Sequence, residues 1–329
     1  MLYPLTFKPL FMERVWGGRN LERLYAKGLP PGVAIGESWE VADRPPAVSV
    51  IANGPLAGHD LRWLMANHAE ELLGHRRTRA DQFPLLVKLL DAEQTLSIQV
   101  HPPPAAAAKL GGQPKTEMWY VVEAKPGAAV WAGLRPGVSR EAFERRLRSG
   151  AVTEFLLRWP VRAGDAMFLR SGQVHAIGEG VVIIEVQQNS DTTYRVFDWN
   201  RLGTDGRPRP LHVDEALASI DFDGSQPALT PAAFEERSGV RCRCLVQDPL
   251  FCVVEYHVQP GAWPAPAGRK GAAILGVVSG QLVVDDRGMD QRLQLEPGQF
   301  CVLPASVQRV ETSATRGAVV LWVEPGDGG

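Results

Sequence analysis

The sequence predicts a mainly β protein with a few peripheral helices, and two observations lead to this prediction. The first is a strict alternation of apolar and polar residues, as in residues 96–101, where Leu96, Ile98 and Val100 alternate with polar residues. A period of two is typical of a strand with two chemically different faces. The second is a series of short strand-like runs between turn residues in the last hundred residues, at 251–258, 272–278, 281–285, 300–303 and 318–323. This spacing indicates an antiparallel jelly roll.

Length and composition limit the possible classes of protein. The 329 residues allow two domains with cores of their own. A formal net charge of -2 gives no electrostatic reason to expect a nucleic-acid or membrane partner. No apolar run approaches the ~18 residues of a membrane span, and the first residues do not follow the pattern of a signal peptide. The four cysteines form no CxxC pair and are expected to be reduced, so we expect a cytoplasmic protein.

Helical spacing of apolar residues is found at few places. We expect helices in three stretches: 60–73, 139–150 and 152–159. Asp60 can cap the first helix and Gly74 can end it, and Ser139 can cap the second. Residues 102–114, rich in alanine and proline, are expected to form a short insertion between two strands.

Candidate metal ligands occur on strands and at a strand end. Gln99 and His101 share the polar face of the strand at 96–101, and Glu117 lies on one face of the next predicted strand, at 118–122, together with Lys115. His175 follows a Ser-Gly turn after a strand at 165–169. Two imidazoles and one carboxylate form a ligand set for catalytic zinc, to which the Gln99 amide oxygen can be added. The same set also suits iron.

Two further stretches carry charge where a cavity is possible. Lys88 lies in the middle of the apolar run 83–92, so its ammonium either reaches the strand edge or points into a cavity and meets an anion. Residues 181–195 alternate apolar and polar side chains, and their polar face either contacts solvent or lines a wet binding cavity. Asp191 and Arg195 are expected to share that face and to be able to pair.

Four motifs in order give the chain a specific resemblance: LSIQVHP at 96–102, KTEMWY at 115–120, GD followed by SGQVHAIG at 164–178, and QQNSDTTYR at 187–195. Together they resemble the type I mannose-6-phosphate isomerases, zinc-dependent members of the cupin superfamily, especially the short bacterial form. The resemblance runs from about Phe7 to Phe222. The chain departs from the family at Pro103-Pro104 and at Arg170, where the family often has a polar pair and a proline.

The resemblance implies a ligand set, an architecture and a substrate. It implies one zinc ion per chain, held by Gln99, His101, Glu117 and His175. It implies two cupin-type jelly-roll barrels, the catalytic one in residues 1–222, a linker at 223–235, and a second, degenerate barrel at 236–329. The second half has no TEMW-like strand and a single histidine, so we expect it to lack a metal site. We expect a small sugar phosphate as the binding partner, and a monomer or weak homodimer.

The implied reaction interconverts D-mannose 6-phosphate and D-fructose 6-phosphate by proton transfer through an enediol. Lys115 is the candidate for the proton-transfer base, with a pKa expected to be lowered near zinc. Arg195 is the active-site arginine that stabilises transition-state charge, and Asp191 orients it or takes part in ring opening. Lys88 and Ser97 are expected near the substrate phosphate.

Two other functions remain open on the sequence. One is a different metal-dependent cupin enzyme, such as an iron oxygenase, which oxygen uptake would reveal. The other is a non-catalytic sugar-phosphate-binding cupin, which would hold zinc and ligand without turnover.

Overall fold

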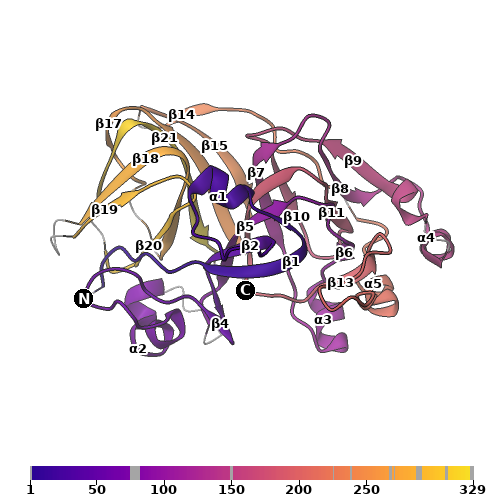
Figure 1. Ribbon diagram of the computed structural model, residues 1–329. Helices are drawn as coiled ribbons and strands as arrows, with labels where there is room; N and C mark the ends of the chain where they lie inside the picture. Colours follow the sequence, from indigo (N-terminus) through magenta and orange to yellow (C-terminus); the bar gives the residue numbers. More distant parts are fainter. Residues whose placement is uncertain are drawn as a thin grey trace.

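The computed structural model describes residues 2–74, 82–148, 151–224, 226–237, 239–266, 269, 271–286, 291–307 and 310–326. Strands dominate, and short helices lie at the periphery (Figure 1). The predicted mainly β class is therefore confirmed. The strand orders of the three large sheets do not close on themselves among the described residues.

Two facing sheets make up the first part of the chain. The six-stranded sheet has the order β1 (Leu10–Gly18), β2 (Ile35–Val41), β5 (Leu85–Ala92), β12 (Val181–Gln188), β7 (Glu117–Ala124) and β10 (Ala166–Leu169). The five-stranded sheet has the order β13 (Tyr194–Phe197), β6 (Ile98–Val100), β11 (His175–Ile177), β8 (Ala129–Leu134) and β9 (Leu156–Pro160). A hydrophobic cluster with Leu90 and Ile183 from the first sheet and Val130 and Ile177 from the second fills the space between them.

Strand register brings polar side chains into this interior. In the six-stranded sheet, Glu185 of the central strand β12 pairs with Lys88 on one side and Trp119 on the other. In the five-stranded sheet, Gln99 of β6 pairs with His175 on one side and Arg195 on the other. Each sheet therefore presents a row of polar groups to its partner.

A third sheet follows in the last third of the chain. It consists of β14 (Glu235–Arg237), β15 (Val240–Gln247), β16 (Phe251–Val258), β21 (Glu311–Pro325), β18 (Ala273–Asp286) and β19 (Gln291–Leu295) in that order, with β17 (Gly261–Trp263) paired to β21 and β20 (Phe300–Leu303) paired to β18. The largest hydrophobic core joins this sheet to the six-stranded sheet, for example through Phe251 and Val87. These strands, coloured orange to yellow, pack beside the first part of the chain (Figure 1).

Small elements cover the sheets. They are the two-stranded sheet of β3 (Asp43–Arg44) and β4 (Ala47–Val48), the helices α1 (Asn20–Tyr25), α2 (Leu61–Leu73), α3 (Pro104–Leu110), α4 (Arg140–Arg148) and α5 (Val213–Ser219), and the 3₁₀ helix η1 (Val152–Phe155). The helix predicted at 60–73 is confirmed, and Asp60 accepts a hydrogen bond from the Trp63 amide as its cap. The helix predicted at 139–150 is α4, with residues 149–150 outside the described range.

Three predicted elements differ from the structure. The insertion at 102–114 contains helix α3, which starts at Pro104, because proline is well suited to the first helical turn. The helix expected at 152–159 is wrong beyond its first turn, because residues from Leu156 onward pair with β8. The two strands expected at 272–278 and 281–285 are one continuous strand, β18, which bends at irregular pairing around Gly280.

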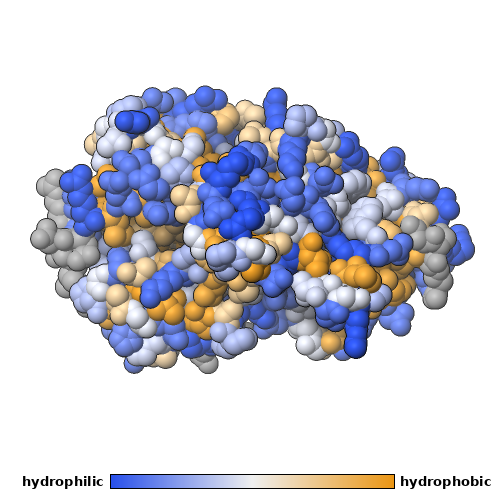
Figure 2. Space-filling model, viewed as in Figure 1, coloured by the Kyte–Doolittle hydropathy of each residue, from blue (hydrophilic) through white to orange (hydrophobic). Residues whose placement is uncertain are grey.

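The surface carries both apolar and hydrophilic side chains (Figure 2), and the cysteines are not bridged. On the face shown in Figure 2, apolar patches on both halves are separated by hydrophilic side chains near the centre. None of the described helices is long and apolar enough to cross a membrane. The four cysteines are free thiols, and two of them, Cys242 and Cys301, are buried.

Candidate metal centre and adjoining cavity

Three buried side chains, one from each of three of the sequence motifs, meet between the two facing sheets. Nε2 of His101 lies 3.2 Å from Oε2 of Glu117, and Nε2 of His175 lies 3.4 Å from Oε1 of the same carboxylate. One ligand atom from each residue can be chosen so that all lie within 4.8 Å of one another. His101 Nε2 and both Glu117 oxygens are buried, and they make no well-aligned hydrogen bond within the part of the chain that the structure describes. The donor set therefore fits a metal ion.

Backbone carbonyls hold both imidazoles in the orientation that ligation needs. Nδ1 of His101 lies 2.9 Å from the Thr192 carbonyl oxygen, and Nδ1 of His175 lies 2.9 Å from the Gln173 carbonyl oxygen. Because a carbonyl can only accept, each Nδ1 carries the proton and each Nε2 lone pair is directed at Glu117. Burial lowers the pKa of His101 to about 3 and also lowers the pKa of His175, so both rings are neutral at pH 7. Neutral imidazole is the form that binds a metal.

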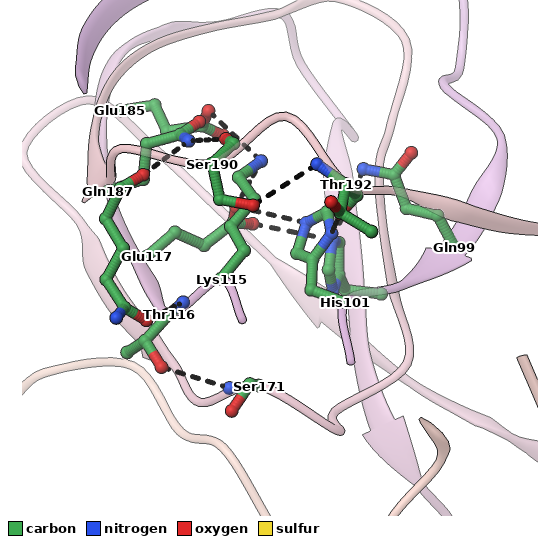
Figure 3. Close-up of polar contacts among 12 residues, drawn as sticks. Gln99, His101, Lys115, Thr116, Glu117, Ser171, Glu185, Gln187, Ser190 and Thr192 are labelled. Carbon is green, nitrogen blue, oxygen red and sulfur yellow. Dashed lines mark hydrogen bonds and ion pairs between the residues drawn. The ribbon is translucent and has the colours of Figure 1, made fainter. Parts of the chain in front are cut away.

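Gln99 borders this cluster, as the sequence predicts. Its Nε2 lies 3.3 Å from Nε2 of His175, and Ser97 Oγ donates to its Oε1 at 3.3 Å. A half-turn of the amide exchanges its nitrogen and oxygen, and would bring the oxygen to the His175 side. In Figure 3, Gln99 lies on the side of His101 that is remote from Lys115 and Glu117. Gln99 can therefore be a further ligand of an ion held by the cluster.

Lys115 connects the metal cluster to a second buried carboxylate. Its Nζ lies 2.8 Å from Oε2 of Glu117 and 3.6 Å from Oε1 of Glu185 (Figure 3). Burial alone would lower the pKa of Lys115, but the charges of Glu117 and Glu185 outweigh it and raise this pKa. The protein's own groups thus raise the pKa of Lys115, because two carboxylates face the ammonium, and the lowered pKa expected beside bound zinc stays a prediction.

The chain of alternating charges continues away from the cluster. Nζ of Lys88 lies 3.4 Å from Glu185 and 3.8 Å from Glu37, and it stands 5.0 Å from the centre of the Trp39 ring. The open question for Lys88 is therefore settled: it meets anions inside the protein. Burial tends to raise the pKa of Glu37, but Lys88 and the bidentate Arg14 hold it at about 2. Every charge in this row has an opposite neighbour, as buried charges require.

A cavity of about 340 Å³ adjoins these residues. Its polar lining includes Ser97, Gln99, Lys88, Lys115, Glu37, Glu185, Asp191, Arg14, Arg195 and Arg209. The polar faces of β6 and β12 therefore line a cavity rather than bulk solvent. This outcome agrees with the cavity interpretation of residues 181–195.

The prediction of one strand from 181 to 195 is wrong in its middle. The chain leaves the sheet after Gln188 and enters the opposite sheet at Tyr194, so Asp191 lies on a connecting loop. Asp191 and Arg195 line the same cavity, but the structure describes both residues and gives no ion pair between them. Gln187 contributes to the crossover, because its Nε2 donates to the carbonyls of Gln188 and Ser190, as the labelled side chains of Figure 3 show.

Arg195 belongs to a cationic end of the cavity. It donates from Nη1 to the Pro210 carbonyl at 2.8 Å. Burial, and next the charge of Arg209, lower its pKa. Asp198 accepts hydrogen bonds from both Arg201 and Arg209. The guanidinium groups of Arg195 and Arg209 both line the cavity, which suits an anionic group.

Several residues of the site were not predicted as site residues. Arg14, Glu37 and Glu185 reach the cavity through strand register, which a single sequence does not display. Glu185 lies on the polar face predicted for residues 181–195, and this alternation was the one sign in the sequence that it could reach the cavity. Arg209 comes from an irregular loop and carries no periodic signal.

A mainly β protein with a buried histidine and carboxylate cluster beside a charged cavity belongs to the class of candidate metal-dependent enzymes acting on small anionic molecules. Comparison with known proteins is more specific. The family described as phosphomannose isomerase type I, catalytic domain, matches residues 5–121. The chain is 37% identical over 259 residues to the mannose-6-phosphate isomerase of Streptococcus mutans, covering 78% of this chain and 80% of that protein.

Solved structures agree with this match. The mannose 6-phosphate isomerase from Bacillus subtilis superposes with a TM-score of 0.89 at 30% identity, covering 98% of this chain and 100% of that one. A zinc-bound mannose 6-phosphate isomerase, 20% identical, has the same fold with a TM-score of 0.76 over 99% of this chain and 100% of that one. The chain belongs to the type I phosphomannose isomerase family.

Proposed function

We propose that this protein is a zinc-dependent isomerase that interconverts D-mannose 6-phosphate and D-fructose 6-phosphate. The observation that carries the proposal is the buried cluster of His101, Glu117 and His175 beside a cavity with a cationic end. Family membership supports the same reaction, since the Streptococcus mutans relative is named for it. The reaction moves one proton between C1 and C2 through an enediol.

We assign one zinc ion per chain to the cluster, with His101, Glu117, His175 and the Gln99 amide oxygen as its ligands. Support comes from the two Nε2 atoms directed at Glu117 and from the two carboxylate oxygens, which accept no well-aligned hydrogen bond in the described part of the chain. Bound zinc would supply Lewis-acid polarisation of the sugar oxygens. The imidazoles are hydrogen-bonded to backbone carbonyls, so the protein holds these two donors in place before metal or substrate binds.

We propose Lys115 as the group that moves the proton. Its Nζ lines the cavity and touches Glu117, so it lies beside the metal cluster. Its raised pKa means that the ammonium form is the resting form, which can donate a proton directly. To act as the base, Lys115 must first release a proton, and Glu185 lies 3.6 Å away to receive it. Glu185 is thus part of the proposed proton path.

We propose that the substrate phosphate binds at the cationic end, against Arg195 and Arg209. Lys88 was expected near the phosphate, but its charge is already matched by Glu37 and Glu185, so a contact with sugar hydroxyls suits it better. Ser97 lines the cavity with a hydroxyl that can donate to a ligand. The roles predicted for Arg195 in stabilising charge and for Asp191 in orienting it or in ring opening stay part of the proposal, and both residues line the cavity.

We also propose a cupin-type architecture of two jelly rolls. The catalytic unit is residues 1–222, followed by a linker at 223–235 and a second unit without a metal site at 236–329. The two facing sheets of the first part and the separate eight-stranded sheet support this division. The cytoplasmic location, and the monomeric or weakly dimeric state, remain predictions.

A coupled isomerase assay tests the function. The purified protein is assayed with mannose 6-phosphate before chelation, after chelation and after return of zinc, with His101→Ala and the exposed-surface control His59→Ala alongside. We expect activity that chelation removes and zinc restores, that is absent in His101→Ala and retained in His59→Ala. Oxygen uptake with an iron-loaded sample would favour an oxygenase. A folded, zinc-loaded protein that binds substrate without turnover would favour a binding module.

A further inference from the structure

The loop between β13 and α5 is hydrogen-bonded to the segment that leads into β6, the strand that carries Gln99. Trp199 Nε1 donates to the Leu96 carbonyl at 2.8 Å, and Arg201 Nη1 donates to the Thr95 carbonyl at 2.8 Å. The loop also closes on itself through a bridge between Leu202 and Pro208. Residues 198–210 therefore form an anchored loop rather than a loose connection.

Asp198 lies in this loop and is 5% exposed, and its carboxylate accepts hydrogen bonds from two arginines. Its Oδ1 accepts from Arg201 Nη2 at 2.6 Å and from Arg209 Nη2 at 2.6 Å, and its Oδ2 accepts from Arg209 Nε at 2.6 Å. The two bonds to Arg209 are a bidentate fork, which fixes the plane of the guanidinium as well as its position. The Nη1 group of Arg209 has no hydrogen bond in the described structure and is free to bind a ligand.

Arg209 lines the cavity, together with Arg195, whereas Asp198 does not. Asp198 therefore does not contact a ligand in the cavity itself, and its hydrogen bonds reach the cavity through Arg209. Arg201 fixes the other side of Asp198, because the same arginine also holds the Thr95 carbonyl. The contacts thus run from the Thr95 backbone, just before β6, to Arg201, then to Asp198, and then to Arg209 at the cavity.

We propose that Asp198, braced by Arg201, is a positioning residue that orients Arg209 to bind the phosphate group of the substrate. This inference rests on the proposed function for the identity of the substrate, but its physical content is the binding of a phosphate oxyanion. The Asp198 carboxylate reduces the net positive charge near the cavity. It also holds the Arg209 guanidinium in one orientation. Preorganisation of this kind lowers the cost of ordering a long side chain on binding.

The Asp198→Asn variant distinguishes two effects of the carboxylate on phosphate binding: its charge and its positioning of Arg209. Loss of the carboxylate adds one net positive charge beside the cavity, so charge alone would make phosphate bind more tightly. Loss of the fork releases the Arg209 guanidinium, so positioning predicts weaker binding. The two explanations differ in sign.

The experiment measures inorganic phosphate binding by calorimetry and mannose 6-phosphate kinetics on the zinc-loaded full chain. For Asp198→Asn we expect the Kd of phosphate and the KM of mannose 6-phosphate to rise about 10-fold, the loss of roughly one charge-assisted hydrogen bond. We expect kcat to change less than about 2-fold, because the phosphate contact stabilises the bound substrate and the transition state equally. The matched control is Asp205→Asn, an exposed carboxylate of the same loop that accepts from the Arg207 backbone.

A double-mutant cycle tests that Asp198 acts through Arg209. In an Arg209→Met background, Asp198→Asn should not weaken phosphate binding further. Unchanged or tighter phosphate binding in Asp198→Asn with Arg209 present, or a weakening that persists without Arg209, would overturn the inference. If Asp198→Asn does not fold, Asp198→Glu decides, because it keeps the charge and shifts the fork: weaker phosphate binding supports positioning and unchanged binding overturns it.

The outcomes separate this inference from the proposed function. A wild-type protein that binds phosphate in an Asp198-dependent way but does not turn over mannose 6-phosphate would keep the inference and reject the function. A wild-type protein that isomerises mannose 6-phosphate with an Asp198→Asn variant of unchanged KM would keep the function and reject the inference. A wild-type protein that binds no phosphate would reject the inference outright.

Discussion

The interior between the first two sheets and the interior of the third sheet have opposite chemistry. The first contains a row of buried charges that includes Lys88, Glu185, Lys115 and Glu117. The third sheet surrounds a cluster of apolar side chains such as Leu275, Val320 and Trp322. Burying charges costs free energy that an apolar interior does not incur. From this difference we infer that the interior between the first two sheets serves binding and chemistry, and that the apolar cluster of the third sheet serves stability.

The sharpest test of this contrast is Glu117→Gln. It removes a proposed zinc ligand and the charge that faces Lys115, so zinc affinity and turnover should fall together. We expect kcat/KM to fall about 1,000-fold or more, which corresponds to ~4 kcal/mol of lost transition-state stabilisation. Steady-state kinetics and metal analysis of the same sample measure both quantities. Near-normal turnover with zinc retained would contradict the assignment.

A buried ion pair in the third sheet should behave differently. Glu255 and Arg243 pair on the side of that sheet that faces the six-stranded sheet, where Tyr120 donates to Glu255, and both side chains are 3% exposed. Glu255→Gln leaves the Arg243 charge buried without its partner, so we expect the free energy of unfolding to fall by about 3 kcal/mol. Turnover per folded, zinc-loaded molecule should stay within about 2-fold. Denaturant titration measures the first quantity and kinetics at low temperature the second, and a selective loss of turnover would break the contrast.

The charge row should also shape the acid stability of the protein. Glu37 has a pKa lowered to about 2, so its ionised form stabilises the fold above its unfolded pKa of roughly 4.3. This stabilisation is lost as pH falls from about 4.3 to about 2, and it amounts to roughly 3 kcal/mol. Denaturant titrations across this range should show a steeper loss in the wild type than in Glu37→Gln. Parallel pH profiles for the two proteins would exclude this contribution.

The smallest effect is expected at a helix that belongs to neither interior. Asp60 caps α2 through a 2.7 Å hydrogen bond from the Trp63 amide. Asp60→Ala should lower the free energy of unfolding by about 1 kcal/mol, while Asp60→Ser, which can still cap, should restore most of it. Zinc content and turnover should not change. Equal losses in both variants would show that the cap does not account for the effect.

Much of the strand framework follows from local patterns. The apolar run at 83–92 and the alternation at 96–101 gave β5 and β6, and strand 300–303 matches β20 at both ends. These predictions succeed because burial on one face or both imposes a period that a short sequence displays. The sequence did not predict that the chain leaves one sheet after Gln188 and enters the other. The alternation of polar residues continues from the cavity-lining strand into the loop, so it does not mark where the strand ends.

The proposed metal ligands were accessible to sequence reasoning, but their surroundings were not. His101, Glu117 and His175 occur in recognisable motifs, and the structure brings them together. Glu37 contacts Lys88 across neighbouring strands, and Arg209 reaches the cavity from a loop, so both contacts depend on tertiary register. The upward effect of the carboxylates on the pKa of Lys115 has the same origin, since the sequence does not show that Glu185 faces it.

The most direct test of the central claim is a zinc titration of chelator-treated protein, followed by isomerisation of mannose 6-phosphate. The charged interior of the first part of the chain should take up one zinc ion, so activity should rise linearly and stop at one equivalent per chain. Glu117→Gln should stay inactive throughout the titration. Full activity in metal-free protein, or zinc saturation without isomerisation, would contradict the account.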